Sequence, residues 1–448
     1  MNWGSATHIF AEGIDPVGMY ATALVLSDGK QKFAIVDLDA LFSQPYSPAI
    51  ALASRKTGIP EAHIRFAASH THAGPSLSAV RGPMGADLTE ASAMMDRYRA
   101  EVIDKIAGLI QQADARLRPV HLYAGRGTGT ININRRFRAQ GGNQPAVGQN
   151  PEGFLDKELV VARIDDAQGK PYAVLVNFQC HGTVLAYENR QISPDWIGTM
   201  RRAVETALPG ALCLYFQGAA GNQGPVEGFT GDLDVAHRLG SILGHQAAAV
   251  ALEIETVRRK PVFEGYVESA ALQAKQHWRV EGPRDATLKF VARTIEVPRR
   301  TYTPQEIASM EARTADAKAR FDTAGDSDPW KKHQAFARYR RLAGMLEKYR
   351  KPPDPSPVKV DMTLLRIGDL AILSMPGEPF ADVGAALKRA SPFAFTMFCG
   401  YSSGEADGYL PTREEFPYGG YEIEQTDYGE GAAESLIEQA SRLYRLVR

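Results

Sequence analysis

Short apolar runs that break into polar turns recur along this chain, and they constrain its fold more strongly than any other feature. Residues 119–124, 159–164 and 172–178 have the length and apolar character of buried strands. Residues 47–56 and 91–116 place apolar residues three and four positions apart, which predicts helices. Because strands and helices alternate, we predict an α/β or layered α+β fold in which helices flank mixed β-sheets.

The first part of the chain is predicted to form a hairpin and a long loop. Two β-rich runs surround Asp28-Gly29 within residues 20–41, and this dipeptide between such runs predicts a hairpin turn. Residues 125–158 are rich in Gly, Asn, Arg and Gln and show little periodicity apart from a short TININRRF segment. We therefore predict a long loop there, which in a compact domain is usually functional or mobile.

The last third of the chain contains a different pattern. Residues 304–350 are charged and helical in pattern, with an interruption near residues 324–329, and KPPDPSP at 351–357 is typical of a hinge. Residues 358–380 return to a strand pattern. The chain has no internal repeat, so we expect one domain over residues 1–448. Its charged helical insertion, at about 304–350, should be a solvent-exposed hairpin rather than a site.

Composition excludes several classes of function. Lys and Arg total 51 against 52 Asp and Glu, so no basic surface indicates a nucleic-acid partner. The three cysteines are far apart, so a metal would be held by nitrogen and oxygen. The start, MNWGSATHIFAEG, lacks the pattern of a signal peptide, and no run reaches the roughly 18 apolar residues of a transmembrane segment. As written, the sequence predicts a cytoplasmic protein.

The stretch FAASHTHAGP, residues 66–75, is the first candidate site. In an extended chain alternate side chains share a face, so we predict that His70 and His72 point the same way and Thr71 the opposite way. Two such imidazoles could share a metal, a substrate oxygen or a proton. The alternative is a pair of surface histidines at a strand end.

Other apolar runs also end in residues that can carry chemistry. His181 follows one run, Glu378 follows a Pro-Gly turn, and Tyr401 and Tyr409 follow a third run. Individually these residues have structural explanations, namely a core histidine, a helix cap and packed tyrosines. Together, two histidines, a carboxylate and a phenolate are a plausible ligand set for zinc at converging strand ends.

The order of the motifs adds a family resemblance. SHTHAGP, INRR, FQCHGT with ISPD, QGAAGNQGP, MPGEPF and GYLPTREEFPYGGYE follow one another along the chain. This series resembles the catalytic domain of the neutral ceramidase family, which are zinc amidases. The resemblance extends from about residue 11 to beyond residue 420 and is least distinctive between residues 260 and 360.

The resemblance implies roles for individual residues. The implied zinc ligands are His70, His181, Glu378 and Tyr409. The implied catalytic residues are His72, Arg135, which helps to polarise the carbonyl, and Tyr421. Arg136 is the alternative to Arg135. The backbone amides near Gly221 and Asn222 are predicted to be additional oxyanion donors, and Ser193 and Asp195 either support the site loop or form a structural turn.

Two departures from the family pattern affect the expected substrate. Gly224 stands where the family has a serine before proline, so the hydroxyl proposed to act in ceramide cleavage is missing. The chain also begins within the family's first motif, so an early strand or an export signal could be absent, and it is too short for the β-sandwich domain of full ceramidases. We therefore expect zinc-dependent hydrolysis of a small or amphiphilic N-acyl amide other than ceramide, with metal-activated water as nucleophile. The alternatives are a zinc esterase or lactonase, and a non-catalytic binding protein.

Overall fold

The computed structural model describes residues 9–75, 85–138, 145–325, 327–406 and 408–448. Parts of the N-terminal segment, of the predicted 125–158 loop, of the 324–329 interruption and of the stretch before Tyr409 therefore lie outside the described residues. The helices are α1 (Pro48–Thr57), α2 (Thr89–Asp114), α3 (Trp196–Ala207), α4 (Leu233–Glu253), α5 (Pro304–Thr323), α6 (Pro329–Tyr349), α7 (Ala381–Ala390), α8 (Tyr421–Gln425) and α9 (Ala432–Ser441).

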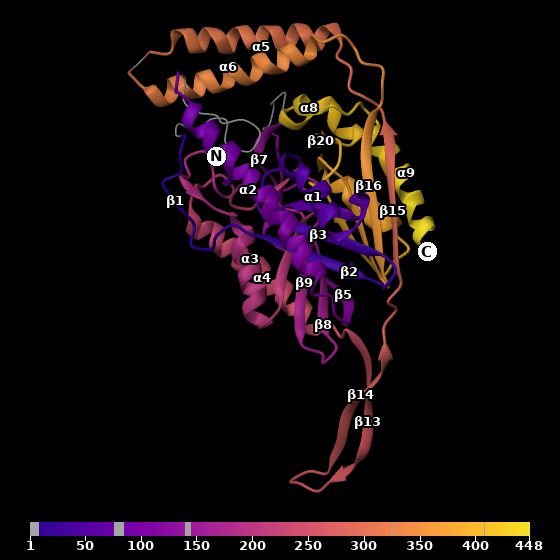
Figure 1. The fold of residues 1–448 in the computed structure, drawn as a ribbon. Helices are drawn as coiled ribbons and strands as arrows, with labels where there is room; N and C mark the ends of the chain where they lie inside the picture. The colour runs from indigo at the N-terminus through magenta and orange to yellow at the C-terminus, as the bar shows by residue number, and fades with distance from the viewer. Residues whose placement is uncertain (1–8, 76–84, 139–144, 326, 407) are drawn as a thin grey trace.

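Three sheets form the body of the molecule (Figure 1). The first consists of β2 (Ala21–Ser27), β3 (Lys32–Leu38) and β4 (Ile64–Ala68). The second has the order β11 (Leu212–Gln217), β9 (Pro171–Phe178), β8 (Glu158–Asp166) and β5 (Val120–Thr128). The third has the order β15 (Leu288–Val297), β16 (Val358–Ile367), β17 (Leu370–Ser374) and β19 (Phe395–Cys399). Parallel and antiparallel pairs occur in each sheet, which confirms the mixed α/β prediction.

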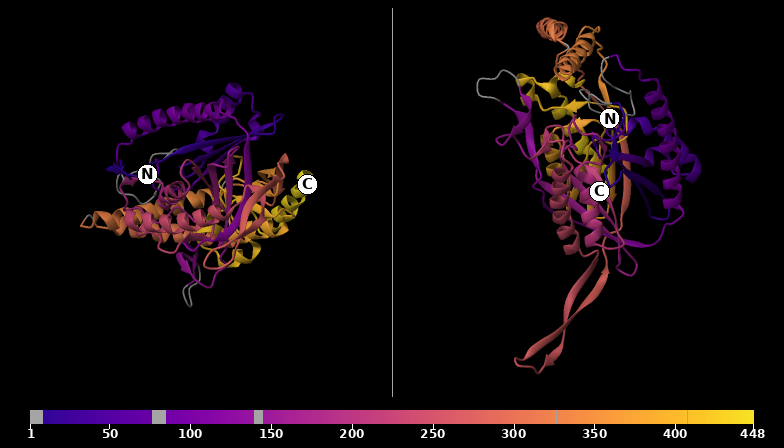
Figure 2. Two further views of the ribbon diagram at one scale, coloured as in Figure 1. Left: turned by 90° about the horizontal axis from the view of Figure 1, so that it is seen from below. Right: turned by 90° about the vertical axis from the view of Figure 1, so that its left-hand side faces the viewer.

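Alternating side chains explain why the strands are apolar on both faces. In β8, Leu159 and Val161 pack with residues of α3 and α4, whereas Val160 and Ala162 pack with the inner faces of the first and third sheets. Helices α1 and α2 cover the first sheet, and α7 and α9 cover the outer face of the third. The result is a layered structure with helices outside and sheets inside (Figure 2).

Two predictions about loops and helices have different outcomes. The helical pair at 304–350 is present as α5 and α6, which pack on each other through a small core of their own. The predicted 125–158 loop is wrong in part, because β5 continues to Thr128 and is followed by β6 (Asn132–Phe137) and β7 (Ala146–Asn150). β6 buries polar side chains, which hydrogen bonds and ion pairs satisfy. Its sequence therefore lacks the apolar pattern by which the other strands were predicted.

Shorter pairings bring distant segments together around the site. β6 lies between β7 and β12 (Gln223–Pro225), and β1 (Gly13–Ile14) pairs with β10 (Gln191–Ile192). β18 (Glu378–Pro379) pairs in parallel with β20 (Tyr409–Leu410). A further hairpin, β13 (Val257–Val267) and β14 (Gln273–Pro283), projects from the body. None of the described helices combines the length and apolar character that a bilayer-crossing segment needs.

Candidate metal centre and active site

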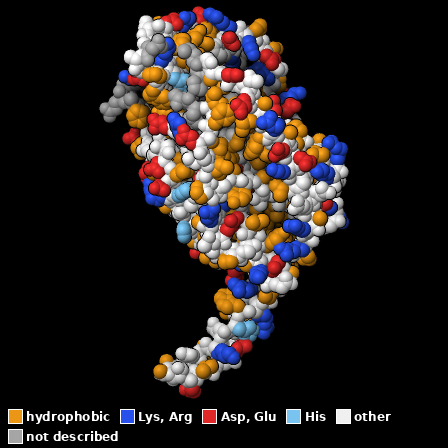
Figure 3. Space-filling model, turned by 60° about the vertical axis from the view of Figure 1, so that its left-hand side comes forward, with side chains coloured by type: hydrophobic (Ala, Val, Ile, Leu, Met, Phe, Trp, Pro, Cys, Tyr) orange, Lys and Arg blue, Asp and Glu red, His pale blue; other side chains and the backbone are white. Residues whose placement is uncertain are grey.

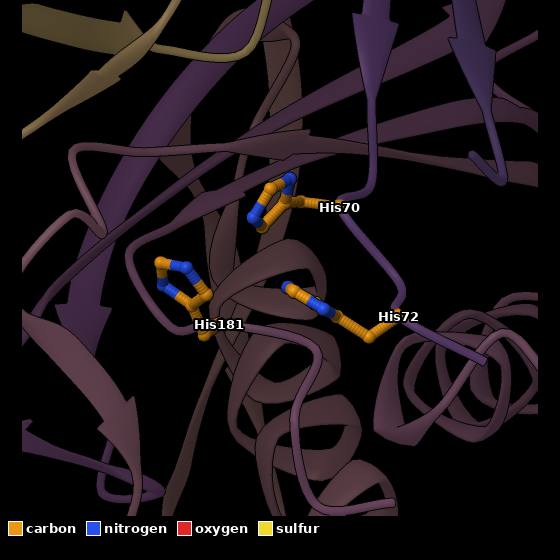
Figure 4. Close-up of side chains that lie close together, drawn as sticks. All are labelled: His70, His72 and His181. Carbon is orange, nitrogen blue, oxygen red and sulfur yellow. The ribbon is translucent and has the colours of Figure 1, made fainter. Parts of the chain in front are cut away.

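Three histidines from two loops gather in the body of the protein (Figure 4). Their side-chain nitrogens include one from each residue that all lie within 4.8 Å of one another. The rings of His70 and His72 are 4.9 Å apart between centroids, and those of His70 and His181 are 4.7 Å apart. His70 and His181 are buried, whereas His72 is partly exposed. The group could hold a metal ion, and both ring nitrogens of His72 are buried although the residue as a whole is partly exposed.

The chain brings His70 and His72 together by a bend rather than by strand alternation. Strand β4 ends at Ala68, and His70 has a φ of 63°, in the left-handed region. The prediction of an extended chain is therefore wrong at His70, although the two rings do face one site. A strained backbone at a buried polar residue is a recurrent feature of functional sites.

A backbone bridge fixes the two histidine loops relative to each other. Thr71 pairs with Gly182 in a parallel bridge, and the His72 amide donates to the Gly182 carbonyl at 3.2 Å. A Cβ at Gly182 would lie 3.0 Å from both the His70 carbonyl oxygen and the Thr71 Cα. Only glycine allows this approach without displacing backbone.

Hydrogen bonds to backbone carbonyls orient two of the imidazoles. Nδ1 of His70 lies 2.7 Å from the Leu41 carbonyl oxygen, and Nδ1 of His181 lies 2.7 Å from that of Ala220. A carbonyl oxygen only accepts, so Nδ1 is the donor and Nε2 of the neutral ring carries the free lone pair. Metal-binding histidines have this arrangement.

Glu378 completes a nitrogen and oxygen donor set. Its Oε2 lies 3.2 Å from Nε2 of His181 and 3.4 Å from Nε2 of His70. The His70 nitrogen has no hydrogen-bond partner among the described residues, although it is buried. A buried nitrogen that faces a carboxylate and lies near a second imidazole is suited to bind a cation. The donor set of nitrogen and oxygen atoms is one that zinc accepts. Each of the three residues follows a strand of a different one of the three sheets, namely β4, β9 and β17.

The electrostatics of the pocket favour neutral rings and an ionised carboxylate. Burial, together with the charge of Arg135, lowers the pKa of His181 to about 3, and burial lowers the pKa of His72 well below its usual value. Burial alone would raise the pKa of Glu378, but the neighbouring His70 and His181 hold it well below its usual value. Metal binding requires these protonation states.

Tyr409 and Arg135 lie beside the donor set. The parallel register of β18 and β20 places Tyr409 next to Glu378. Arg135 donates from Nη2 to the Tyr409 hydroxyl oxygen at 3.0 Å and from Nε to Glu422 at 3.0 Å. The ring of Tyr421 lies 5.7 Å from that of Tyr409, and Tyr421 is 37% exposed. Tyr421 therefore stands on the solvent side of the buried pair.

Arg136 has a different environment from its neighbour. It donates to Glu415, to Glu422 and to the Gly419 carbonyl, each at 2.8 Å. The register of β6 with β7 is irregular between Asn134 and Arg136, and both arginines reach Glu422. Arg135 also donates to Tyr409, whereas the other contacts of Arg136 are to Glu415 and Gly419. Glu422, which binds both arginines, was not predicted, because a glutamate after Tyr421 has no distinctive sequence signal.

Comparison with known proteins identifies the family. Residues 6–229 match the sequence model described as neutral/alkaline non-lysosomal ceramidase, N-terminal, which is half of the chain. The chain belongs to this ceramidase family. It is 25% identical over 438 residues to the neutral ceramidase of Pseudomonas aeruginosa, covering 92% of this chain and 64% of that protein. It is 24% identical to the neutral ceramidase of Mycobacterium tuberculosis, covering 87% of this chain and 64% of that protein.

Solved ceramidase structures share the fold. The crystal structure of the P. aeruginosa neutral ceramidase has a TM-score of 0.65 at 19% identity, covering 99% of this chain and 73% of that one. A ceramidase complexed with C2 has a TM-score of 0.63 at 20% identity, covering all of this chain and 73% of that one. The chain thus spans about 64% of the length of its curated ceramidase relatives.

The turn at Gly221 and Asn222 has a structural part in this ceramidase-family site. The Gly221 amide donates to the Pro379 carbonyl at 2.8 Å, so the prediction of a free oxyanion donor is wrong for this group. The Asn222 side chain accepts from the Ala381 amide and donates to Asp382, which attaches the turn to α7. A Cβ at Gly221 would lie 2.4 Å from the Glu378 carbonyl oxygen, so this glycine allows close packing beside Glu378.

Gly224, the departure from the family pattern, lies in β12 beside Arg135. A Cβ there would lie 3.4 Å from the Cβ of Arg135, which is ordinary contact. The position therefore has room for a serine but presents no hydroxyl.

The ISPD segment, residues 192–195, and the adjoining Trp196 are hydrogen-bonded to the two histidine loops. The Thr71 hydroxyl donates to the Ser193 carbonyl at 2.8 Å, and Ser193 donates to Asp15 at 2.6 Å. Asp195 accepts from the Trp196 amide, and the Trp196 indole donates to the His181 carbonyl at 3.0 Å. Neither the indole contact nor Asp15 was predicted.

Proposed function

We propose that this protein is a zinc-dependent amidase that hydrolyses an N-acyl amide bond. The observation that carries the proposal is the convergence of His70, His181 and Glu378, whose donor atoms face one point. Membership of the ceramidase family supports the same reaction class. Tyr409, adjacent to Glu378, is proposed as the fourth ligand.

The ion and the chain have separate tasks. A bound Zn²⁺ supplies Lewis acidity toward a carbonyl oxygen and lowers the pKa of water. The residues must hold the substrate, stabilise negative charge and move a proton. Arg135 is suited to the charge, because Glu422 fixes its guanidinium group while Nη2 faces the site.

His72 and Tyr421 are proposed to act on the substrate side. The neutral imidazole of His72 lies beside His70 and His181, so it is placed to hydrogen-bond a substrate at that group or transfer a proton. Tyr421 stands where a substrate would enter and offers a ring and a hydroxyl to it.

The proposed substrate is an N-acyl amide that is smaller or more polar than long-chain ceramide. The main support is Gly224, which leaves the wall beside Arg135 without the hydroxyl that the family pattern has there. An ester or lactone is the second candidate, because the same donor set can polarise an ester carbonyl.

A combined assay tests the proposal. Purified protein is loaded with Zn²⁺, its metal content is measured, and turnover is followed by mass spectrometry. The panel contains N-acylated amines and amino acids, the matching esters and detergent-matched ceramides of several chain lengths. We expect amides to be hydrolysed and the shorter, more polar ones to have the highest kcat/KM. Hydrolysis of esters alone would replace the amidase by the esterase, and full metal loading without turnover would support a binding protein.

A further inference from the structure

The hairpin of β13 and β14, residues 257–283 and here called the arm, projects from the body on the side away from α5 and α6 (Figures 1 and 2). Nearly every residue of both strands is exposed. An isolated two-stranded hairpin is only marginally stable in water, so exposed apolar side chains on it need a partner.

The register of the arm separates an apolar face from a charged face. Cross-strand partners lie on the same face, and alternate pairs share it. One set of alternating pairs is Pro261 with Trp278, Phe263 with Gln276 and Tyr266 with Ala274. The intervening pairs include Lys260 with Arg279 and Val262 with His277. A β-bulge between Phe263 and Gly265 keeps Tyr266 on the apolar face.

The arm stands clear of the body, and Figure 3 shows hydrophobic and charged side chains mixed on the side in view. The side chains of the apolar face are exposed in the single chain. Phe263, Tyr266 and Trp278 are 53%, 70% and 60% exposed, and Val280 is 59% exposed. Taking about 150–250 Å² for each aromatic side chain, these three alone expose roughly 300–400 Å². The largest apolar patch on a typical monomer measures about 300–600 Å² and is often functional, and the aromatic patch of the arm falls in this range.

Several charged side chains of the arm form ion pairs, including the one on its apolar face. On the charged face, Lys260 pairs with Glu281 at 2.8 Å, and Glu264 pairs with His277 at 2.9 Å. The charged residue on the apolar face, Arg259, pairs with Glu255 at 2.7 Å and lies over the Trp278 ring. The apolar face can therefore pack against an identical face without opposing two unpaired like charges.

We propose that the apolar face of the arm binds the same face of a second copy of this chain, giving a two-fold symmetric dimer. A stable interface buries about 800 Å² on each partner, and the aromatic side chains supply roughly half of that. Pairing through the β13 edge is disfavoured, because Pro261 has no amide hydrogen and two bulges interrupt the strand. Face-to-face packing of the two arms avoids this edge.

The position of the arm argues against a lipid surface as its partner. Tyr421, the exposed residue of the candidate active site, begins α8, which lies at the opposite end of the body from the arm in Figures 1 and 2. A bilayer that held the arm would face away from that end.

Oligomeric state tests the proposal directly. Sedimentation velocity of the full chain, from sub-micromolar to about 100 µM, should show a dimer that dissociates on dilution. The double variant Phe263→Ser with Trp278→Ser should weaken the dimer at least about 100-fold, since buried aromatic residues dominate interface energies. Val267→Ser, an exposed apolar residue on the charged face, is the matched control and should leave the dimer unchanged. Circular dichroism spectra should be the same in all three proteins, and their thermal midpoints should agree at concentrations where all are monomeric.

Thiol labelling tests which face is covered. The native cysteines, Cys180, Cys213 and Cys399, are all buried, so an introduced surface cysteine reports alone. Gln276→Cys on the apolar face should react with a maleimide several-fold more slowly at dimer concentrations than after dilution. Gln273→Cys on the charged face should react equally at both. A monomer at all concentrations, a dimer indifferent to the double variant, or equal protection of both thiols would overturn the proposal. Vesicle binding lost with the double variant of a monomeric protein would assign the arm to lipid instead.

Discussion

The adjacent arginines of β6 allow a paired substitution that separates catalysis from folding. Arg135→Ala removes the guanidinium group beside Tyr409, whereas Arg136→Ala removes one bound to Glu415, Glu422 and Gly419. Both side chains are buried in the same strand. The two variants therefore remove the same kind of side chain from neighbouring positions. They differ in the contacts that are lost, to Tyr409 in one and to Glu415 and Gly419 in the other.

We expect Arg135→Ala to lower kcat mainly and Arg136→Ala to lower the free energy of unfolding mainly. Removing one donor to a developing oxyanion typically lowers kcat by about 10²–10³-fold, and we expect this for Arg135→Ala with bound metal retained. Arg136→Ala removes contacts to Glu415, Glu422 and the Gly419 carbonyl, and although Arg135 still pairs with Glu422, we expect the loss of three such bonds to cost about 2–4 kcal/mol. Arg135→Ala also removes an ion pair to Glu422, but Arg136 still neutralises it, so we expect a loss of stability of about 1–3 kcal/mol.

Steady-state kinetics, metal analysis and urea unfolding of both variants check these values. Arg135→Lys is a useful third variant, because lysine keeps the charge but loses the planar fork that binds Glu422 and Tyr409 together. The reasoning would be refuted if Arg135→Ala raised KM alone, which would indicate uniform substrate binding. It would also fail if Arg136→Ala were the stable and inactive member of the pair.

Three further outcomes are expected. Alanine at His70, His181 or Glu378 should abolish both metal binding and turnover, against about one zinc per chain in the parent; unchanged metal stoichiometry in His181→Ala would remove that residue from the ligand set. Alanine at His72 should leave the metal content intact and lower kcat by about 10²-fold or more, and loss of metal from this variant would make His72 a ligand instead. Rapid-quench kinetics should show amine and acid released at the same rate from the first turnover, because Gly224 offers no nucleophile; an amine burst near one per active site would instead indicate an acyl-enzyme, with Ser69 or Thr183 as the hydroxyl to examine.

The strands of the body could be predicted because they are buried on both faces. β8 and β9 contribute apolar side chains to two cores each, so their sequences are nearly continuous apolar runs. The hairpin at Asp28-Gly29 and the pair α5 and α6 could be predicted because turn chemistry and helical spacing are local signals.

β6 and the arm could not be predicted from such patterns. β6 buries Asn and Arg side chains whose partners lie up to 287 residues away, and distant partners leave no local signal. The arm has no core in the single chain, so its mixed charges and aromatics resemble a loop sequence. The β-bulges also shift the alternation that would have marked its apolar face.

The residues of the site could be predicted from the sequence, but much of their geometry could not. The motif order gave the histidines, Glu378, Tyr409 and Arg135, and the structure brings them together. The left-handed backbone of His70, the occupied amide of Gly221 and the bridging carboxylate of Glu422 depend on tertiary contacts. Sequence spacing carries no information on those contacts.

His70, His181 and Glu378 follow strands of three different sheets, and this has a thermodynamic consequence. An ion bound by all three would act as a non-covalent cross-link between sheets that otherwise meet through apolar packing and a few buried hydrogen bonds. Free ion at about 100 times its dissociation constant would stabilise the folded chain by about 2.7 kcal/mol. Chelation should therefore loosen the loops that close the strand ends before it affects the cores, and amide hydrogens around residues 69–73 and 180–183 should exchange faster while those of β8 and β9 stay protected.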